Sequence, residues 1–136
     1  MIKPIVKDML VLQQKAQPAS KEDVEIGQDL LDTLRANKDK CVGMAANMIG
    51  MQKQVIIFMY GMVPVIMFNP ILRRKSSPYQ AEEFCLSLVG SRSTTRYKEI
   101  TVEYLDQHWQ KQTLTLKGFP AQICQHELDH LEGRII

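Results

Sequence analysis

Two histidines spaced four residues apart near the end of the chain constrain its fold more than any other feature. They lie in the segment 125–130, which reads Gln-His-Glu-Leu-Asp-His. At about 100° per residue, His126 and His130 project from nearly the same face of an α-helix, with Glu127 beside the first. Two neutral imidazoles can hold a divalent ion, and a neighbouring carboxylate can relay a proton. The pattern therefore predicts a metal-binding helix, and the intervening glutamate disfavours the alternative of a solvated polar face.

A metal on this helix needs a third protein ligand, and the spacing indicates that it comes from upstream. The metzincin pattern would place a third donor at Ile136, whose side chain has none. Cys124 lies two residues before His126, which turns it about 200° around the helix, away from the metal. His108 falls in Asp-Gln-His-Trp-Gln, which is typical of an exposed hairpin turn.

Two cysteines remain as candidates for the third ligand. Cys41 opens a glycine- and alanine-containing stretch, and Cys85 stands between apolar residues in Glu-Phe-Cys-Leu-Ser. A cysteine in apolar surroundings is usually an inert buried thiol. Because the histidine pair lacks one ligand, we nevertheless favour Cys85.

Composition and charge predict an ordinary globular protein. The 136 residues suffice for one domain, 1–136, and are 45% hydrophobic and 24% charged. A formal charge of +2 is too small to indicate nucleic-acid binding. The first residues lack a secretory apolar segment, and no apolar run approaches the roughly 18 residues of a membrane span. With three cysteines, an odd number, these features favour a cytoplasmic protein without a disulfide framework.

The hydrophobic pattern favours an α+β fold in which antiparallel β-sheets pack around the C-terminal metal-binding helix. Ser20 is a suitable N-cap for an amphipathic N-terminal helix. Gly118 and Pro120 precede the last helix, where proline suits the first turn. The expected elements are a helix at 21–37, strands at 55–60 and 63–68 joined through Gly61, a loop at 73–81, and a hairpin of strands 99–106 and 112–117.

Three short segments resemble, in order, the three motifs of the peptide deformylases. These motifs are Gly-x-Gly-x-Ala-Ala-x-Gln, Glu-Gly-Cys-Leu-Ser and Gln-His-Glu-x-Asp-His, and they correspond here to 41–48, 83–87 and 125–130. The third is intact, and the second differs only by Phe84 in place of glycine. The first is divergent and keeps one glycine and the two alanines. The resemblance extends over essentially the whole chain, which looks like a short form of the family.

The resemblance implies a metal held by Cys85, His126 and His130. The resemblance implies that this metal is Fe(II), with Zn(II) or Ni(II) able to occupy the same site. It further implies that Glu127 shuttles a proton to the leaving amine, while the backbone N–H of Leu86 helps to hold the oxyanion.

The reaction that the resemblance implies is hydrolysis of the N-formyl group from formyl-methionyl peptides, which releases formate. The partners would be nascent chains, with the ribosome as a further contact to consider. Gly43 and Ala45 would present main-chain groups to the peptide as an added strand. Met44, Phe119 and Ile123 would line a pocket for the methionine side chain.

One departure from the motifs predicts reduced activity. Met48 stands where the family has a glutamine whose amide stabilises the oxyanion, and a thioether cannot donate a hydrogen bond. Loss of one such donor lowers the rate by roughly 10²–10³-fold. Asn47 carries an amide, but a shift of one residue normally points it elsewhere. Cys41 and Phe84, both in place of glycine, add bulk to the cleft.

These substitutions keep two other hypotheses open. One is a metallo-amidohydrolase acting on a different N-acyl substrate. The other is a catalytically weak homologue that binds peptide and metal.

Overall fold

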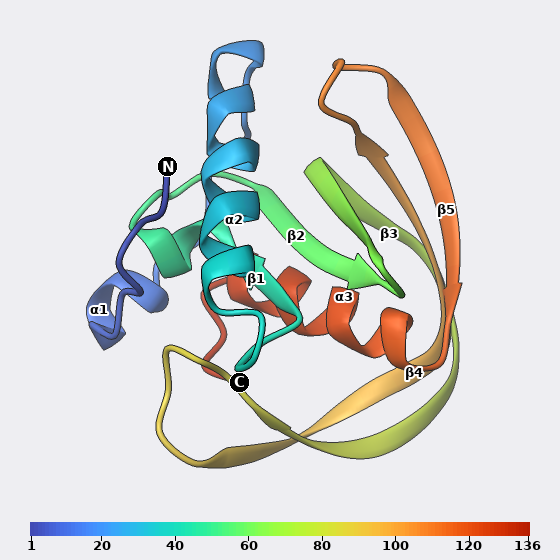
Figure 1. Cartoon of the computed structure of the whole chain (residues 1–136). Coiled ribbons are helices and arrows are strands. Elements are labelled where there is room, and N and C mark those ends of the chain that lie inside the picture. The colour runs from blue at the N-terminus through green and yellow to red at the C-terminus, as the bar shows by residue number, and fades with distance from the viewer.

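The chain forms one five-stranded antiparallel sheet with helices packed against it, in a computed structural model that describes residues 1–136 (Figure 1). The strands are joined in sequence order, so that β1 and β5 are the edges. This confirms the α+β prediction, with a single sheet in place of several. The elements are α1 (Met9–Leu12), a 3₁₀ turn (Lys21–Asp23), α2 (Val24–Ala36), β1 (Gly43–Ala45), a second 3₁₀ turn (Ala46–Ile49), β2 (Val55–Tyr60), β3 (Val63–Phe84), β4 (Ser91–Leu105), β5 (Lys111–Lys117) and α3 (Phe119–Leu131).

The predicted N-terminal helix is confirmed, with a 3₁₀ first turn that leads into α2. The Ser20 backbone N–H donates to the Asp23 carboxylate at 2.8 Å, which satisfies a polar group at the helix start. The last helix is also confirmed, and it places Pro120 in its first turn.

The expected loop at 73–81 is wrong, because these residues belong to the 22-residue strand β3. They pair with β4, with Lys75 opposite Ile100 and Tyr79 opposite Arg96. Most of the segment is exposed, which explains why its sequence is polar and lacks the apolar pattern of a buried strand. Within β3, only residues 63–68 pair with β2, so the rest of β3 has a free edge that tolerates Pro78.

Curvature of the β3–β4 ribbon brings the end of β3 to the last helix. Two register shifts, between Phe68 and Ile71 and between Leu72 and Arg74, interrupt the ladder where the ribbon bends. Beyond them the two strands sweep beneath α3 (Figure 1). The turn after β3, which contains Cys85, is thereby carried back toward the helix that bears the histidines.

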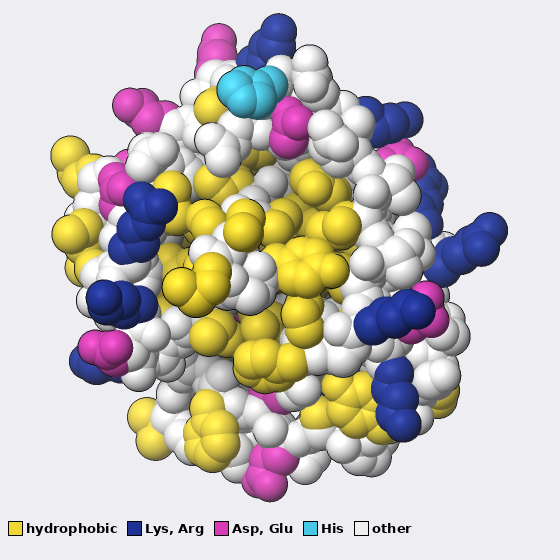
Figure 2. All heavy atoms as spheres, turned by 45° about the vertical axis from the view of Figure 1, so that its right-hand side comes forward, with side chains coloured by type: hydrophobic (Ala, Val, Ile, Leu, Met, Phe, Trp, Pro, Cys, Tyr) yellow, Lys and Arg dark blue, Asp and Glu magenta, His cyan; other side chains and the backbone are white.

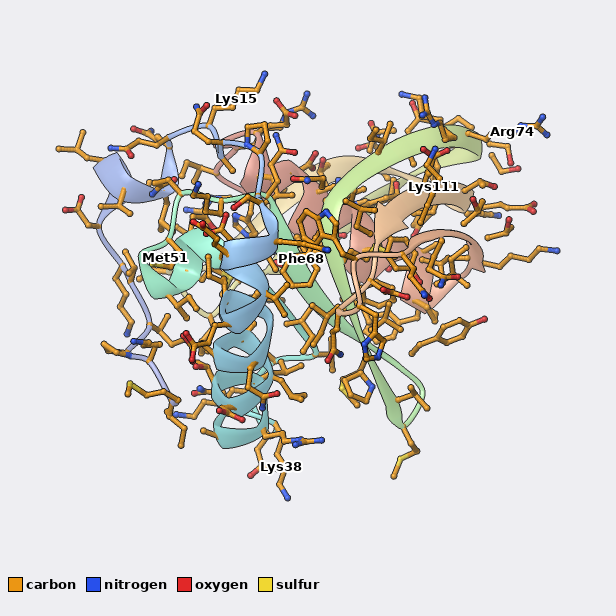
Figure 3. All side chains as sticks on the ribbon, turned by 90° about the horizontal axis from the view of Figure 1, so that it is seen from above. Lys15, Lys38, Met51, Phe68, Arg74 and Lys111 are labelled. Atoms are coloured by element: carbon orange, nitrogen blue, oxygen red, sulfur yellow. The ribbon has the colours of Figure 1, made fainter.

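The core lies on both sides of the inner strands. Phe68 is fully buried and points between α2 and the strands (Figure 3). A Cβ on Gly27 of α2 would lie 2.8 Å from Phe68 Cζ and 3.0 Å from Ile66 Cγ2. α2 therefore approaches the sheet this closely only because residue 27 is glycine. On the other side, α3 packs against β1, β2 and β4.

On the face shown in Figure 2, apolar side chains gather in the centre, while cationic and anionic side chains are spread around the periphery. This face therefore has no concentrated patch of one charge. None of the helices has the length and apolar character needed to cross a bilayer.

Replacing Gly27 by valine should lower the free energy of unfolding by about 1–3 kcal/mol, because the new methyl groups overpack Phe68. Urea unfolding measures the change. Gln28→Val, at the exposed neighbouring position, introduces the same side chain and should change stability by less than about 1 kcal/mol. Equal stability of the two variants would contradict this packing.

Candidate metal centre and active site

Cys85, His126 and His130 come together in a buried group whose ligand atoms all lie within 4.8 Å of one another. His130 Nε2 is 3.0 Å from His126 Nε2 and 3.3 Å from Cys85 Sγ. Ligands at tetrahedral positions around Zn(II) or a similar ion are roughly 3.3–3.6 Å apart, given bond lengths of about 2.0–2.3 Å. The three side chains therefore fit a single divalent ion with only small adjustments.

The other candidate ligands lie elsewhere. His108 is exposed in the turn between β4 and β5, as predicted. Cys124 is fully buried in the core, and burial raises the pKa of its thiol. Cys41 lines the cavity next to the site, but burial raises the pKa of its thiol to about 11. Cys85 is the cysteine whose sulfur lies within 4.8 Å of both histidines, which makes it the third member of the group.

Glu83 orients His126. Its carboxylate Oε1 lies 2.7 Å from His126 Nδ1, so the imidazole donates there and Nε2 is the nitrogen that faces the other candidate ligands. Burial opposes ionisation of Glu83, but hydrogen bonds from His126, Arg96 and Gln122 hold the pKa of its carboxyl at about 2. A carboxylate charged at neutral pH therefore lies directly behind one of the three candidate ligands.

Arg96 connects this carboxylate to the rest of the helix. Its guanidinium is almost completely buried and donates to both oxygens of Glu83, at 2.7 and 2.9 Å. It also donates to Asp129 of α3 at 2.7 Å. Gln122, one turn before His126, donates to Glu83 at 2.9 Å. Sequence reasoning missed Arg96 and Gln122, because one arginine in a strand and one glutamine on a helix carry no pattern of their own.

The two candidate histidine ligands differ in their charge state. Burial and the neighbouring His126 lower the pKa of His130 to about 3, so His130 is neutral, as a metal ligand must be. Burial also disfavours the charged form of His126, but the neighbouring Cys85 thiol and the hydrogen bond to Glu83 raise its pKa to about 10. Without a metal His126 therefore carries a second proton, which metal binding would displace.

Glu127 is buried beside this group. Burial raises the pKa of its carboxyl to about 7, so it can both take up and release a proton near neutrality. Its Oε1 atom has no hydrogen-bond partner. A Cβ on Gly43 would lie 2.9 Å from Glu127 Oε2 and 2.7 Å from Ile123 Cγ2. A side chain at position 43 would therefore clash with Glu127 and Ile123 of α3, so glycine is the residue that fits there.

A cavity of about 700 Å³ opens in front of these residues. Of the residues expected to bind substrate, Gly43, Phe119 and Ile123 line it, together with Leu86, Met48 and Phe84. The Leu86 N–H makes no intramolecular hydrogen bond.

The expectation that Met44 lines this pocket is wrong. Its side chain is fully buried in the core that includes α2, outside the cavity wall. The side chain of Ala45 is likewise in the core. Because successive residues of a strand point to opposite faces, a pocket position cannot be assigned without the register.

β1 presents a free main-chain edge to the cavity. Val42 C=O accepts a hydrogen bond from Met59 N–H of β2 at 2.8 Å. Because bonding alternates along an antiparallel ladder, the main-chain groups of Gly43 and Ala45 face away from β2. This edge can pair with an extended peptide.

Asn47 does not take the place of the missing glutamine. Its amide donates to the main-chain oxygens of His130 at 3.0 Å and Leu12 at 3.4 Å. Met48 is 1% exposed and lines the cavity. The cavity wall therefore has a thioether where the motif has an amide donor.

The fold and the buried Cys-His-His group with its adjacent glutamate define an α+β protein built like a metallohydrolase. A model of the polypeptide deformylase family matches residues 2–136. A peptide deformylase of Clostridium beijerinckii is 54% identical over 136 residues, which cover 100% of both chains. The chain belongs to the peptide deformylase family, which is a family of hydrolases.

Solved structures agree with this assignment. A class I type b peptide deformylase from Acinetobacter baumannii, determined with Met-Ala-Ser bound, superposes with a TM-score of 0.89 at 28% identity, covering 99% of this chain and 97% of that one. The enzyme from Thermus thermophilus gives a TM-score of 0.86 at 29% identity, covering 99% of this chain and 83% of that one.

Replacing Glu83 by glutamine should weaken metal binding about 10- to 100-fold, because His126 loses its charged acceptor. Competition between the protein and a chromophoric chelator for Zn(II) measures the affinity. Glu82→Gln changes the exposed neighbour in the same way and should leave the affinity unchanged. An unaltered affinity in Glu83→Gln would show that this carboxylate does not support the site.

Proposed function

We propose that this protein removes the N-formyl group from formyl-methionyl peptides and releases formate, with 1–136 acting as one catalytic domain. The observation that carries the proposal is the buried, unpartnered carboxylate oxygen of Glu127 beside the Cys85, His126 and His130 group and the open edge of β1. Fe(II) is the proposed metal in the cell, with Zn(II) or Ni(II) as alternatives. The substrates would be nascent chains in the cytoplasm, and a ribosome contact belongs to the same proposal.

The shape of the site supports binding of an extended peptide. An extended chain would pair with the main-chain groups of Gly43 and Ala45, which places its formyl end at the buried group. The first side chain would enter the cavity between Phe119 and Ile123 of α3. An apolar side chain as long as methionine gains most from this wall.

The chain's own residues would divide the chemistry among them. When bound by Cys85, His126 and His130, a divalent ion would polarise the formyl carbonyl and lower the pKa of water. Glu127 would take the proton of the attacking water and deliver it to the departing amine nitrogen. Leu86 N–H would donate to the oxygen on which negative charge develops.

Met48 would lower the rate of the proposed hydrolysis. Leu86 would supply one oxyanion donor, while the second position is occupied by a side chain that cannot donate. The amide of Asn47 is committed to main-chain oxygens. The proposed activity is therefore reduced by the loss of one donor.

Isosteric replacement of Glu127 by glutamine should lower kcat for formate release from formyl-Met-Ala-Ser by about 10²–10⁴-fold, because the proton relay is lost. The assay uses protein purified without oxygen and loaded with Fe(II) or Ni(II), and metal content is measured in parallel. Glu132→Gln, at the exposed end of the same helix, should retain full activity and metal, and chelation should abolish turnover in all three proteins.

Other outcomes of this assay would point to the alternatives. Absence of formate release from fully loaded protein, with turnover of an acetyl- or other acyl-peptide, would indicate a different N-acyl substrate. Peptide binding without turnover, unaffected by Glu127→Gln, would indicate a binding homologue.

Met48→Gln should raise kcat/KM for the formyl peptide by about 10²-fold, because it restores a donor to the cavity wall. The two side chains are similar in length, so the substitution tests the amide rather than the volume. Met51→Gln makes the same change at a half-exposed position outside the cavity and should have no effect. A rate that stays the same or falls in Met48→Gln would contradict this role.

A further inference from the structure

Three exposed apolar side chains surround the mouth of the cavity. Val42, Phe84 and Phe119 are 39%, 76% and 62% exposed, and all three line the cavity. They come from three separate parts of the chain: the residue before β1, the end of β3 and the first turn of α3. Single exposed apolar residues are common on protein surfaces, but a group of them at a cavity is typical of a binding surface.

Within this rim, formed by Val42, Phe84 and Phe119, Phe84 lies between two buried residues of the site. Along the end of β3, Glu83 and Cys85 are 7% and 9% exposed, and the side chain between them points outward. Phe84 is therefore adjacent in sequence to a candidate metal ligand, yet it lies outside the buried group.

The path of the peptide brings its later residues to this rim. Its formyl end would lie at Glu127 and its first side chain inside the cavity, so the residues that follow must cross the mouth. Lys40 and Glu82 also line the mouth and carry opposite charges, so the mouth has no charge preference of one sign. Apolar contact is then the main source of discrimination there.

We propose that Phe84 is a specificity-determining residue that favours an apolar, above all aromatic, side chain on the second or third residue of the peptide. The occupant of the rim is the same peptide whose first residue fills the cavity, because the rim is continuous with the cavity wall. This inference rests on the proposed function. The physical gain is burial of the exposed ring together with an aromatic or aliphatic contact.

The test compares formyl-Met-Phe-Ser with formyl-Met-Asp-Ser, and formyl-Met-Ser-Phe with formyl-Met-Ser-Asp. At one of the two positions the parent protein should prefer phenylalanine by about five- to tenfold in kcat/KM, mainly through KM. In Phe84→Ser this preference should fall to about twofold or less. Val89→Ser is the matched control, because Val89 is 95% exposed in the following turn and does not line the cavity. It should keep the full preference.

A second readout needs no turnover: calorimetry measures the affinities of the unformylated peptides Met-Phe-Ser, Met-Asp-Ser, Met-Ser-Phe and Met-Ser-Asp. The same difference, and its loss in Phe84→Ser, should be seen in their dissociation constants. Equal affinities in the parent at both positions, or a preference that survives in Phe84→Ser, would overturn the inference. A difference in affinity without formate release from any peptide would support the inference while the proposed function fails.

Discussion

The site depends on one buried carboxylate, that of Glu83. It accepts hydrogen bonds from Arg96 of β4 and from Gln122 and His126 of α3, and so joins three elements at one point. An unpaired buried charge would be strongly destabilising, whereas this one has charged and polar donors on several sides. Asp129 balances the other end of Arg96. Because Cys85 is two residues beyond Glu83, the network that docks the strand end also places the third candidate ligand.

The same constraint explains the length of β3. A short hairpin would leave the Glu-Phe-Cys segment far from α3, whereas the curved ribbon brings it back beneath the helix (Figure 1). Residues 71–78 of the ribbon are exposed, so their own side-chain burial contributes little to holding the ribbon in place. Its position relative to the histidines is fixed by contacts with α3: the pairs of Glu83 with His126 and of Arg96 with Asp129, and the hydrogen bonds between Tyr97 and Gln125. Ile100 of β4 is also buried in the same core cluster as residues of α3.

The sequence was sufficient to predict the last helix, the closeness of Cys85 to its two histidines, and most of the strands. These have strong signals: histidine spacing, helix caps and apolar strand runs. It was insufficient for 73–81, because a polar strand that contains Pro78 looks like a loop until a partner strand is known. It also misplaced Met44, whose side-chain direction depends on register, and it missed Arg96, whose role comes only from tertiary contacts. Gly43 was expected for its main chain, whereas the structure adds a steric reason, the adjacent Glu127.

The most direct test of the account is the coordination of the bound metal, measured by X-ray absorption spectroscopy on Co(II)- or Zn(II)-loaded protein. If Cys85, His126 and His130 hold the ion, the spectrum should show one sulfur, two imidazole nitrogens and a light-atom ligand, with the sulfur absent from Cys85→Ser and retained in Cys41→Ser. A metal environment without sulfur, or a sulfur shell that survives in Cys85→Ser, would contradict the account.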